Sequence, residues 1–207
     1  VSVAEHVLAL LFSFQKNIHL QYNSVQNYSW NRLTGSEIQG SVMGIVGLGD
    51  VGKELAKKAL ALGMIVYAFD LVKDEEFLSE YKDIMFRENV DEIYQNADVI
   101  SLHLPHTLKT HKLLNSEVFL KLKRKPIIIN TSRGKLVDID ALISALNKGF
   151  IKGYLTDVLS NEPIVDDERL VGLDNIIITP HVGSRTFQSV ARQGTISVKN
   201  LINNLIK

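Results

Sequence analysis

The sequence predicts an α/β fold, a doubly wound parallel sheet with helices on both faces, from three observations. Six short apolar segments each have the length of one buried strand, and stretches with helical spacing separate them. A glycine pattern joins the first of these strands to its helix. Short, continuous apolar strands that alternate with helices are typical of a parallel sheet covered on both sides. The predicted strands are residues 43–46, 65–69, 99–102, 127–129, 153–157 and 176–178.

The glycines of Gly47-Leu48-Gly49-Asp50-Val51-Gly52 follow the first predicted strand directly. In this G-x-G-x-x-G pattern the first glycine permits a tight turn, the second lets a pyrophosphate approach the backbone, and the third lets the helix pack on its strand. The unpaired N–H groups and the positive dipole end at the start of that helix form an anion site. The pattern predicts a Rossmann-type dinucleotide site, and a chance match in a glycine-containing loop is the alternative.

The residues that follow the glycine pattern favour the dinucleotide site. Apolar residues recur at helical spacing from Val51 to Leu62, and Gly63 stands where the helix should end. Asp70 ends the next strand 18 residues after Gly52, close to the spacing at which a carboxylate meets the ribose hydroxyls. Because a carboxylate repels a 2′-phosphate, we expect NAD rather than NADP. The alternative is a solvated aspartate that caps a strand.

An opening helix and an arm precede the first strand of what we expect to be one domain over residues 1–207. The apolar pattern of residues 3–18 predicts a largely buried helix, and residues 17–40 are interpreted as a loop or extended arm around Trp30. An arm with a tryptophan often packs on a partner subunit, and packing on its own domain is the alternative. Further helices are predicted at residues 90–95, 116–122, 138–149 and 187–205.

The composition limits the classes of partner and compartment. Lys plus Arg and Asp plus Glu both number 23, so the formal charge is zero and neither nucleic acid nor a membrane surface is expected as a partner. The chain has no cysteine, which excludes a disulfide framework and predicts a reducing compartment, the cytoplasm. The apolar run 7–14 is too short to span a bilayer and lacks the flanking features of a signal peptide.

Polar side chains follow three of the later strands. Arg133 comes after the strand at 127–129, Asp157 ends the strand at 153–157 with Glu162 just beyond, and His181 follows the strand at 176–178. Each has an ordinary alternative as a surface or loop residue, since loops are generally polar. Because the carboxyl ends of parallel strands share one edge with the glycine loop, we expect these side chains to meet there.

These residue types suit the oxidation of a hydroxy acid with a nicotinamide cofactor. An arginine can bind the substrate carboxylate or carbonyl, and a histidine can accept the hydroxyl proton as hydride leaves. Glu162 can hold the histidine and stabilise its imidazolium. A serine hydrolase fits less well because no G-x-S-x-G occurs. No metal site is predicted, because His103, His106 and His111 lack a zinc-binding pattern on a helix.

Over nearly all its length the chain resembles the D-isomer-specific 2-hydroxyacid dehydrogenases. Formate dehydrogenases of that superfamily carry glutamine in place of Glu162, so the glutamate favours hydroxy-acid chemistry. His106 departs from the family, whose members often have an apolar residue after this proline. The resemblance is carried by residues 3–6, 47–52 and 103–105, by Thr107 and Thr110, and by residues 130–134, 157–163 and 179–183.

The resemblance also implies roles for individual residues. Arg133 would bind the substrate, and Glu162 and His181 would form the acid–base pair. Asp157 would contact the nicotinamide carboxamide. The cofactor-binding residues predicted from the glycine pattern and the resemblance together are Gly47, Leu48, Gly49, Val51, Gly52, Asp70, Thr107 and Asp157.

The family resemblance further implies a larger enzyme. Its members insert this domain in a substrate domain built from both chain ends, so we expect the 207 residues to be an isolated coenzyme domain that is poorly active alone. We also expect a homodimer formed through the arm around Trp30 and the opening helix. The substrate is expected to be a small D-2-hydroxy acid or its 2-keto acid, and phosphoglycerate, lactate, glyoxylate and hydroxypyruvate all stay open.

Two other classes of protein remain as alternatives at this point. One is an NAD(H)-sensing binding protein, similar to the transcriptional corepressors that share the fold and keep the arginine, glutamate and histidine. The other is a redox-inactive structural domain, which predicts no cofactor affinity. Intact catalytic residues favour the enzyme without excluding a sensor.

Overall fold

The fold is built on one seven-stranded sheet in which all neighbouring strands run parallel. The computed structural model describes residues 1–205 of the chain. Along the sheet the order is β3-β2-β1-β4-β5-β6-β7, so the chain winds outward from the middle to one edge and then builds the other half. The predicted doubly wound arrangement is therefore confirmed. The strands are β1 (Val42–Val46), β2 (Ile65–Phe69), β3 (Ile84–Phe86), β4 (Val99–Leu102), β5 (Ile127–Asn130), β6 (Gly153–Thr156) and β7 (Ile176–Ile178).

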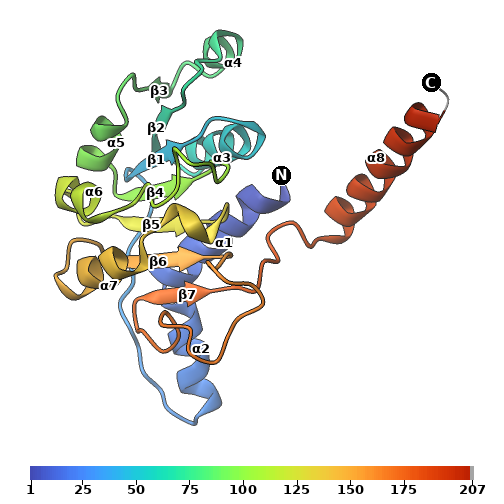
Figure 1. Ribbon diagram of the computed structural model, residues 1–207. Helices are drawn as coiled ribbons and strands as arrows, with labels where there is room; N and C mark the ends of the chain where they lie inside the picture. Colours follow the sequence, from blue (N-terminus) through green and yellow to red (C-terminus); the bar gives the residue numbers. More distant parts are fainter. Residues whose placement is uncertain (206–207) are drawn as a thin grey trace.

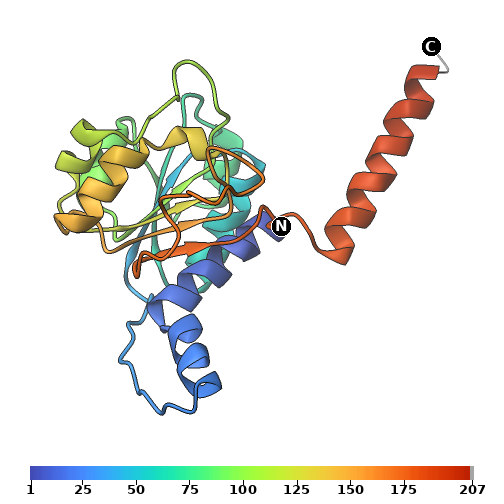
Figure 2. The ribbon, with the colours of Figure 1, turned by 60° about the horizontal axis from the view of Figure 1, so that its bottom comes forward.

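Helices cover both faces of the sheet, and Figure 2 shows the sheet between the two helical layers. Successive side chains of a strand point to opposite faces. Ile129 of β5 thus belongs to the core on one face, and Ile128 belongs to the core on the other. The first core lies under α1 (Ser2–Gln15), α3 (Asp50–Ala61) and α4 (Glu75–Glu80). The second lies under α5 (Val90–Asn96), α6 (Ser116–Lys121) and α7 (Ile139–Asn147).

The winding reverses between β1 and β4, which brings distant loops to one edge of the sheet. β1 pairs with β2 on one side and with β4 on the other. Gly47 directly follows β1 and His103 directly follows β4. Gly47 has a φ angle of 103°, and a Cβ on it would lie 2.5 Å from the carbonyl oxygen of His103. Only glycine therefore fits between these two loops.

The predicted ends of α3 and α7 are confirmed. Gly63, just after α3, has a φ angle of 76°, and Gly149, after α7, has a φ angle of 68°. Asp138 caps the start of α7, where its Oδ1 accepts hydrogen bonds from the N–H groups of Asp140 at 3.1 Å and Ala141 at 3.2 Å. These helix ends could be predicted from the sequence because a cap depends only on neighbouring residues.

The arm contains a helix that the sequence did not predict. Residues 17–40 were expected to be a loop or extended arm, yet α2 spans Ile18–Gln26. None of its residues is buried, so the segment lacks the apolar periodicity that identifies a helix. Asn17, in the left-handed conformation, separates α2 from α1 and leaves Ile18 53% exposed rather than on the buried face of α1. Beyond α2 the arm is irregular, and Trp30 is 82% exposed.

The long C-terminal helix α8 (Phe187–Leu205) is present as predicted but does not close the domain. Figure 1 shows it projecting from the body beyond the segment that follows β7, and Figure 2 agrees. Only Ser189 of its side chains is buried, while Phe187 and Leu205 are 95% and 77% exposed. The amphipathic pattern predicted the helix, but the pattern does not specify what its apolar side contacts. Among residues 1–205, no helix is both long and apolar enough to cross a membrane.

Candidate functional site

A cleft of about 410 Å³ opens at the carboxyl edge of the sheet. It lies between the start of α3 and the segments that follow β4, β5, β6 and β7. The structure therefore brings the predicted polar residues to the same place as the glycine loop, as expected for a doubly wound sheet. Its lining includes Gly49, Val51, Gly52, His103, Thr131, Arg133, Asp157 and His181.

The glycine loop leaves room for a phosphate group in front of α3. A Cβ on Gly49 would meet no heavy atom within 4 Å. Gly49 is the N-cap of α3 and no side chain caps this helix, so the first N–H groups of the helix are available to an anion. The hydroxyl of Thr131, which lines the same cleft, is buried and has no hydrogen-bond partner among the described residues. Open space, backbone donors and an unused hydroxyl fit a bound dinucleotide.

Asp70 lies beside the start of the glycine loop. Its Oδ2 accepts a hydrogen bond from the N–H of Leu48 at 2.6 Å, and its Oδ1 accepts one from the N–H of Leu71 at 2.6 Å. Lys73 forms an ion pair with Glu75 at 3.1 Å and so does not neutralise Asp70. A negative charge therefore stands where the ribose hydroxyls of a dinucleotide are expected.

Two predicted cofactor residues do not line the cleft with their side chains. Leu48 is 4% exposed and packs in the core under α3, so only its backbone can face a dinucleotide. Thr107 is exposed on the loop after β4, where its N–H donates to the hydroxyl of Thr110 at 2.8 Å. The cofactor contacts of both residues stay predictions.

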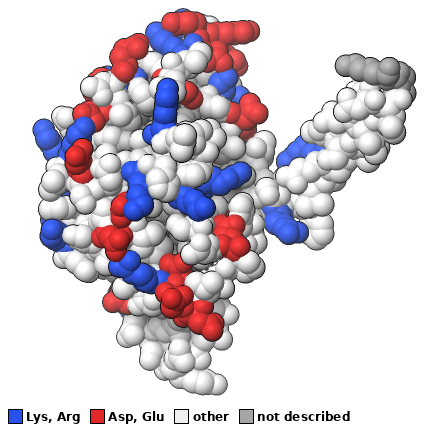
Figure 3. Space-filling view, viewed as in Figure 1, with Lys and Arg blue, Asp and Glu red and all other residues white. Residues whose placement is uncertain are grey.

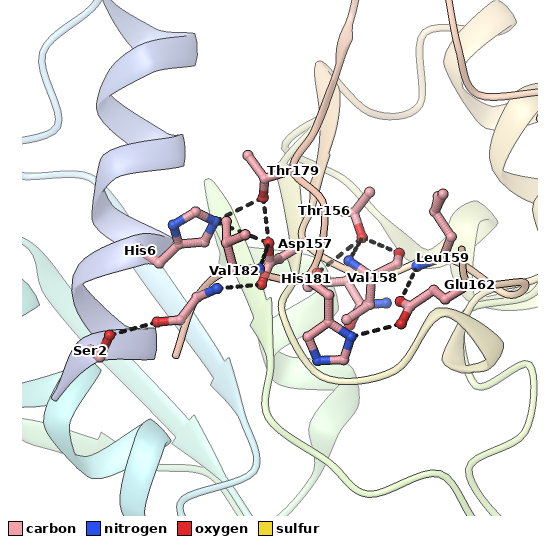
Figure 4. A network of polar contacts seen from close by, with 12 residues as sticks. Ser2, His6, Thr156, Asp157, Val158, Leu159, Glu162, Thr179, His181 and Val182 are labelled. Carbon is pink, nitrogen blue, oxygen red and sulfur yellow. Dashed lines mark hydrogen bonds and ion pairs between the residues drawn. The ribbon is translucent and has the colours of Figure 1, made fainter. Parts of the chain in front are cut away.

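Asp157 is the buried charged group of the site, with 2% of its surface exposed. Its carboxylate accepts hydrogen bonds from the hydroxyl of Thr179 at 2.6 Å and from the N–H groups of Val182 at 2.9 Å and Gly183 at 2.8 Å. Nε2 of His6 lies 3.4 Å from Oδ1 of Asp157, as Figure 4 shows. Burial raises the pKa of Asp157, but these contacts outweigh burial and lower the pKa to about 2. The group is therefore a carboxylate.

His181 and Glu162 are in direct contact, with 2.7 Å between Nδ1 and Oε2 (Figure 4). The other oxygen of Glu162 accepts the N–H of Leu159 at 2.9 Å. Burial raises the pKa of Glu162, but the hydrogen bonds from His181 and Leu159 outweigh burial and lower it. His181 has a φ angle of 55°, a left-handed conformation that costs a non-glycine residue about 1 kcal/mol or more. Glu162 thus holds Nδ1 of the ring and leaves Nε2 for a substrate.

Arg133 is exposed at the mouth of the cleft after β5. Its Nη1 donates to the carbonyl of Ser132 at 2.6 Å, and within residues 1–205 no carboxylate forms an ion pair with it. A Cβ on Gly134 would lie 2.1 Å from the carbonyl carbon of Leu159, so the glycine lets this turn approach the loop that carries Glu162. A hollow of about 560 Å³ beside the cleft is lined by the arginine and by both members of the acid–base pair.

The three histidines near the end of β4 do not converge on one point. Nε2 of His103 lies 2.9 Å from the hydroxyl of Ser101, and burial lowers the pKa of His103 to about 4. Nε2 of His106 instead lies 3.1 Å from Nδ1 of His111 on the exposed loop. His103 is therefore a neutral residue of the cleft wall, and the other two form a separate pair.

Sequence reasoning gave no individual role to His6, Thr131 or Thr179, although all three stand in the motifs that carry the family resemblance. His6 is a polar residue on a largely apolar helix, and Thr179 directly follows β7. These two positions were the signals from which a role in the site could have been predicted. The contact between His6 and Thr179, 2.8 Å from Nε2 to Oγ1, joins residues 173 positions apart and cannot be read from local spacing.

Comparisons with known proteins find relatives over most of the chain. Residues 8–183 match the family model described as D-isomer specific 2-hydroxyacid dehydrogenase, NAD binding domain. The chain is 39% identical to the D-3-phosphoglycerate dehydrogenase of Bacillus subtilis, over 90% of this chain and 35% of that protein. It is 35% identical to the hydroxypyruvate reductase of Thermotoga maritima, over 99% of this chain and 66% of that protein.

A solved structure has a similar overall fold. The D-lactate dehydrogenase from Aquifex aeolicus complexed with NAD and lactic acid has a TM-score of 0.84 and 31% identity, over 98% of this chain and 66% of that chain. The chain thus spans between about one third and two thirds of the length of these proteins.

We predict that Asp157 makes the stability of the domain sensitive to acid. Its pKa is about 2 in the folded protein against an ordinary value of 3.8, so the carboxylate stabilises the fold at pH values above the unfolded pKa. That contribution, about 2 kcal/mol, is lost as the pH falls from about 5 towards 2. Urea denaturation between pH 7 and pH 3 should show this loss as a falling free energy of unfolding. Asp157→Asn should make the free energy of unfolding depend less on pH. Asp167→Asn on an exposed loop is the control, and an equally steep curve for Asp157→Asn would refute the assignment.

Proposed function

This chain belongs to the NAD-binding domain family of the D-isomer-specific 2-hydroxyacid dehydrogenases, and from that premise we propose that the protein transfers a hydride between NAD and a D-2-hydroxy acid or its 2-keto acid. The observation that carries the proposal is the His181–Glu162 contact of 2.7 Å in a hollow that Arg133 also lines. Relatives named as a dehydrogenase and a reductase favour an enzyme over a sensor. The cytoplasm, where free NAD(H) is available, is part of the proposal.

The acid–base pair accounts for the proton in this reaction. When bound, the nicotinamide cofactor supplies the hydride for reduction of the carbonyl carbon. Glu162 accepts the Nδ1 hydrogen of His181, which fixes the ring and leaves Nε2 to donate a proton to the carbonyl oxygen. In the oxidation direction Nε2 accepts the hydroxyl proton, and the carboxylate stabilises the imidazolium that forms.

Arg133 and Asp157 complete the proposed set of contacts. An arginine without a carboxylate partner can bind the substrate carboxylate through two parallel hydrogen bonds. Oδ2 of Asp157 accepts one hydrogen bond, from the N–H of Gly183, and so keeps an acceptor position for the nicotinamide carboxamide. The N–H groups at the start of α3 would hold the pyrophosphate.

The main test replaces His181 in the full-length protein. His181→Ala should lower kcat for 2-keto acid reduction by about 10²- to 10⁴-fold, because the proton donor is lost. NADH affinity should stay nearly unchanged. Glu162→Gln should move the decline of reduction to lower pH, because the imidazolium loses its carboxylate. Steady-state kinetics across pH measures both effects, with His19→Ala on α2 as the control. Normal turnover in His181→Ala would end the proposal.

We propose NAD rather than NADP as the cofactor because Asp70 is held beside the glycine loop and Lys73 is paired elsewhere. Like charges brought together in a partly desolvated site can cost several kcal/mol. Fluorescence titration with NADH and NADPH should therefore give tighter NADH binding. Asp70→Ser should narrow the difference, and the exposed Asp83→Ser should not. Tighter NADPH binding by the unmodified protein would overturn this assignment.

We further propose that the arm and α1 form a two-fold interface between identical chains. Support comes from Trp30 and Tyr28, which are 82% and 99% exposed instead of packing on their own domain. Light scattering after size-exclusion chromatography should give about twice the chain mass of 23.2 kDa. Trp30→Ala should shift the equilibrium to the monomer, because aromatic anchors dominate such interfaces. Leu120→Ala on α6 is the exposed apolar control, and a monomer at micromolar concentration would count against the dimer.

We propose that residues 1–207 fold and bind NADH by themselves but reduce 2-keto acids very poorly. Two cores and the dinucleotide cleft lie within this chain, whereas Arg133 and His181 stand exposed on one side of the reaction site. Holding the reactants in place and excluding water can supply about 7 to 11 kcal/mol, and this would require a second wall. Saturable NADH fluorescence with negligible turnover is expected, and Gly49→Val should remove the binding. Turnover of about 1 s⁻¹ or more would show a complete site.

A further inference from the structure

The hollow beside the reaction site carries a second cation that the reaction itself does not use. It is lined by Arg133, His106 and Lys135 together with the acid–base pair. Lys135 stands two positions after Arg133 in the short helix η1 (Gly134–Leu136), and its side chain is exposed. Figure 3 shows Lys and Arg side chains near the middle of this face, over β5 and η1. We propose that Lys135 and His106 form a subsite for a second anionic group at the far end of the substrate.

The carboxylates around Lys135 are all engaged elsewhere. Asp138 pairs with Lys112 at 2.9 Å, and Asp140 pairs with Arg169 at 2.7 Å. Glu162 is held by His181. Among the described residues, Lys135 forms no ion pair. Arg133 and Lys135 thus face the hollow without a carboxylate partner among the described residues, whereas Glu162 in the same hollow is paired with His181. Two such cations attract anions.

The cofactor phosphates do not account for this charge. The glycine loop and α3 line the 410 Å³ cleft, which Lys135 does not line. Lys135 instead lines the 560 Å³ hollow and a neighbouring one shared with His106 and His111. A pyrophosphate on the glycine loop would thus leave Lys135 free.

Charge counting then points to the class of substrate. This step rests on the proposed function, in which Arg133 takes the carboxylate next to the reacting carbon. One carboxylate neutralises one cation, so Lys135 remains for a second negative group. His106, at the edge of the same hollow, adds a hydrogen-bond donor or acceptor through its ring. The structure assigns this protein to 2-keto acids with a phosphate, sulfonate or carboxylate at the other end.

The test compares two substrates that differ by one phosphoryl group, hydroxypyruvate and phosphohydroxypyruvate, in the full-length protein. The preferred substrate should be the phosphorylated one, with kcat/KM higher by about two- to fivefold, the effect of one exposed ion pair. Because the effect is electrostatic, the preference should shrink as salt rises. Lys135→Ala should reduce the preference, and Lys135→Arg should retain most of it. Lys152→Ala removes an exposed lysine at the opposite edge of the sheet, before β6, and should leave the preference as it is.

The outcomes separate this inference from the proposed function. The anion subsite would be overturned if both substrates turned over without a preference for the phosphorylated one, or if Lys135→Ala left that preference intact. The proposed dehydrogenase activity would stand in either case. A complete lack of turnover with these and with uncharged-tail 2-keto acids would overturn the proposed function and the subsite with it. His106→Ala should also weaken the preference, because the imidazole ring at the edge of the same hollow can hydrogen-bond the anionic group.

Discussion

The buried carboxylate of Asp157 is the interaction on which the carboxyl edge of the sheet depends. An uncompensated carboxylate in the interior would cost several kcal/mol, so its donors must stay in place. They come from three separate parts of the chain: His6 on α1, Thr179 at the end of β7, and the N–H groups of the next segment. Ser2 adds a hydrogen bond to the carbonyl of Gly183 at 2.7 Å. One charge thus fixes the first helix against the last strand.

The geometry around His181 follows from that constraint. His181 lies between Thr179 and Val182, and both neighbours are tied to Asp157. The N–H of His181 also donates to the carbonyl of Thr179 at 3.0 Å. A left-handed histidine is tolerated only where the surrounding backbone is held in this way. The close approach of Gly134 to Leu159 then brings the loop of Glu162 to the ring.

The arm and α8 bury few of their apolar side chains, unlike the helices that cover the sheet. The residues of α1, α3 and α5 to α7 bury their apolar sides against the sheet. The arm and α8 instead leave Tyr28, Trp30, Phe187 and Leu205 largely exposed. Large apolar side chains that are exposed together along one segment are typical of an interface. Neither segment contributes a strand to the sheet, although Ile38 near the end of the arm packs in the core under α1 and α3.

Apart from β3, the sequence by itself determined the strands of the sheet, the caps at Asp138 and Gly63, and the edge at which the polar residues meet. Those features depend on local spacing or on a general rule of parallel sheets. It also predicted His181 and Glu162 as partners, first from their residue types at one edge of the sheet and then from the resemblance to a family. Only the tertiary structure decided that Leu48 packs in the core, that α2 exists, and that Asp157 is bound by α1. The exposed helix α2 carries no apolar pattern that could identify it. Contacts between residues more than a hundred positions apart arise only when the sheet brings their loops together.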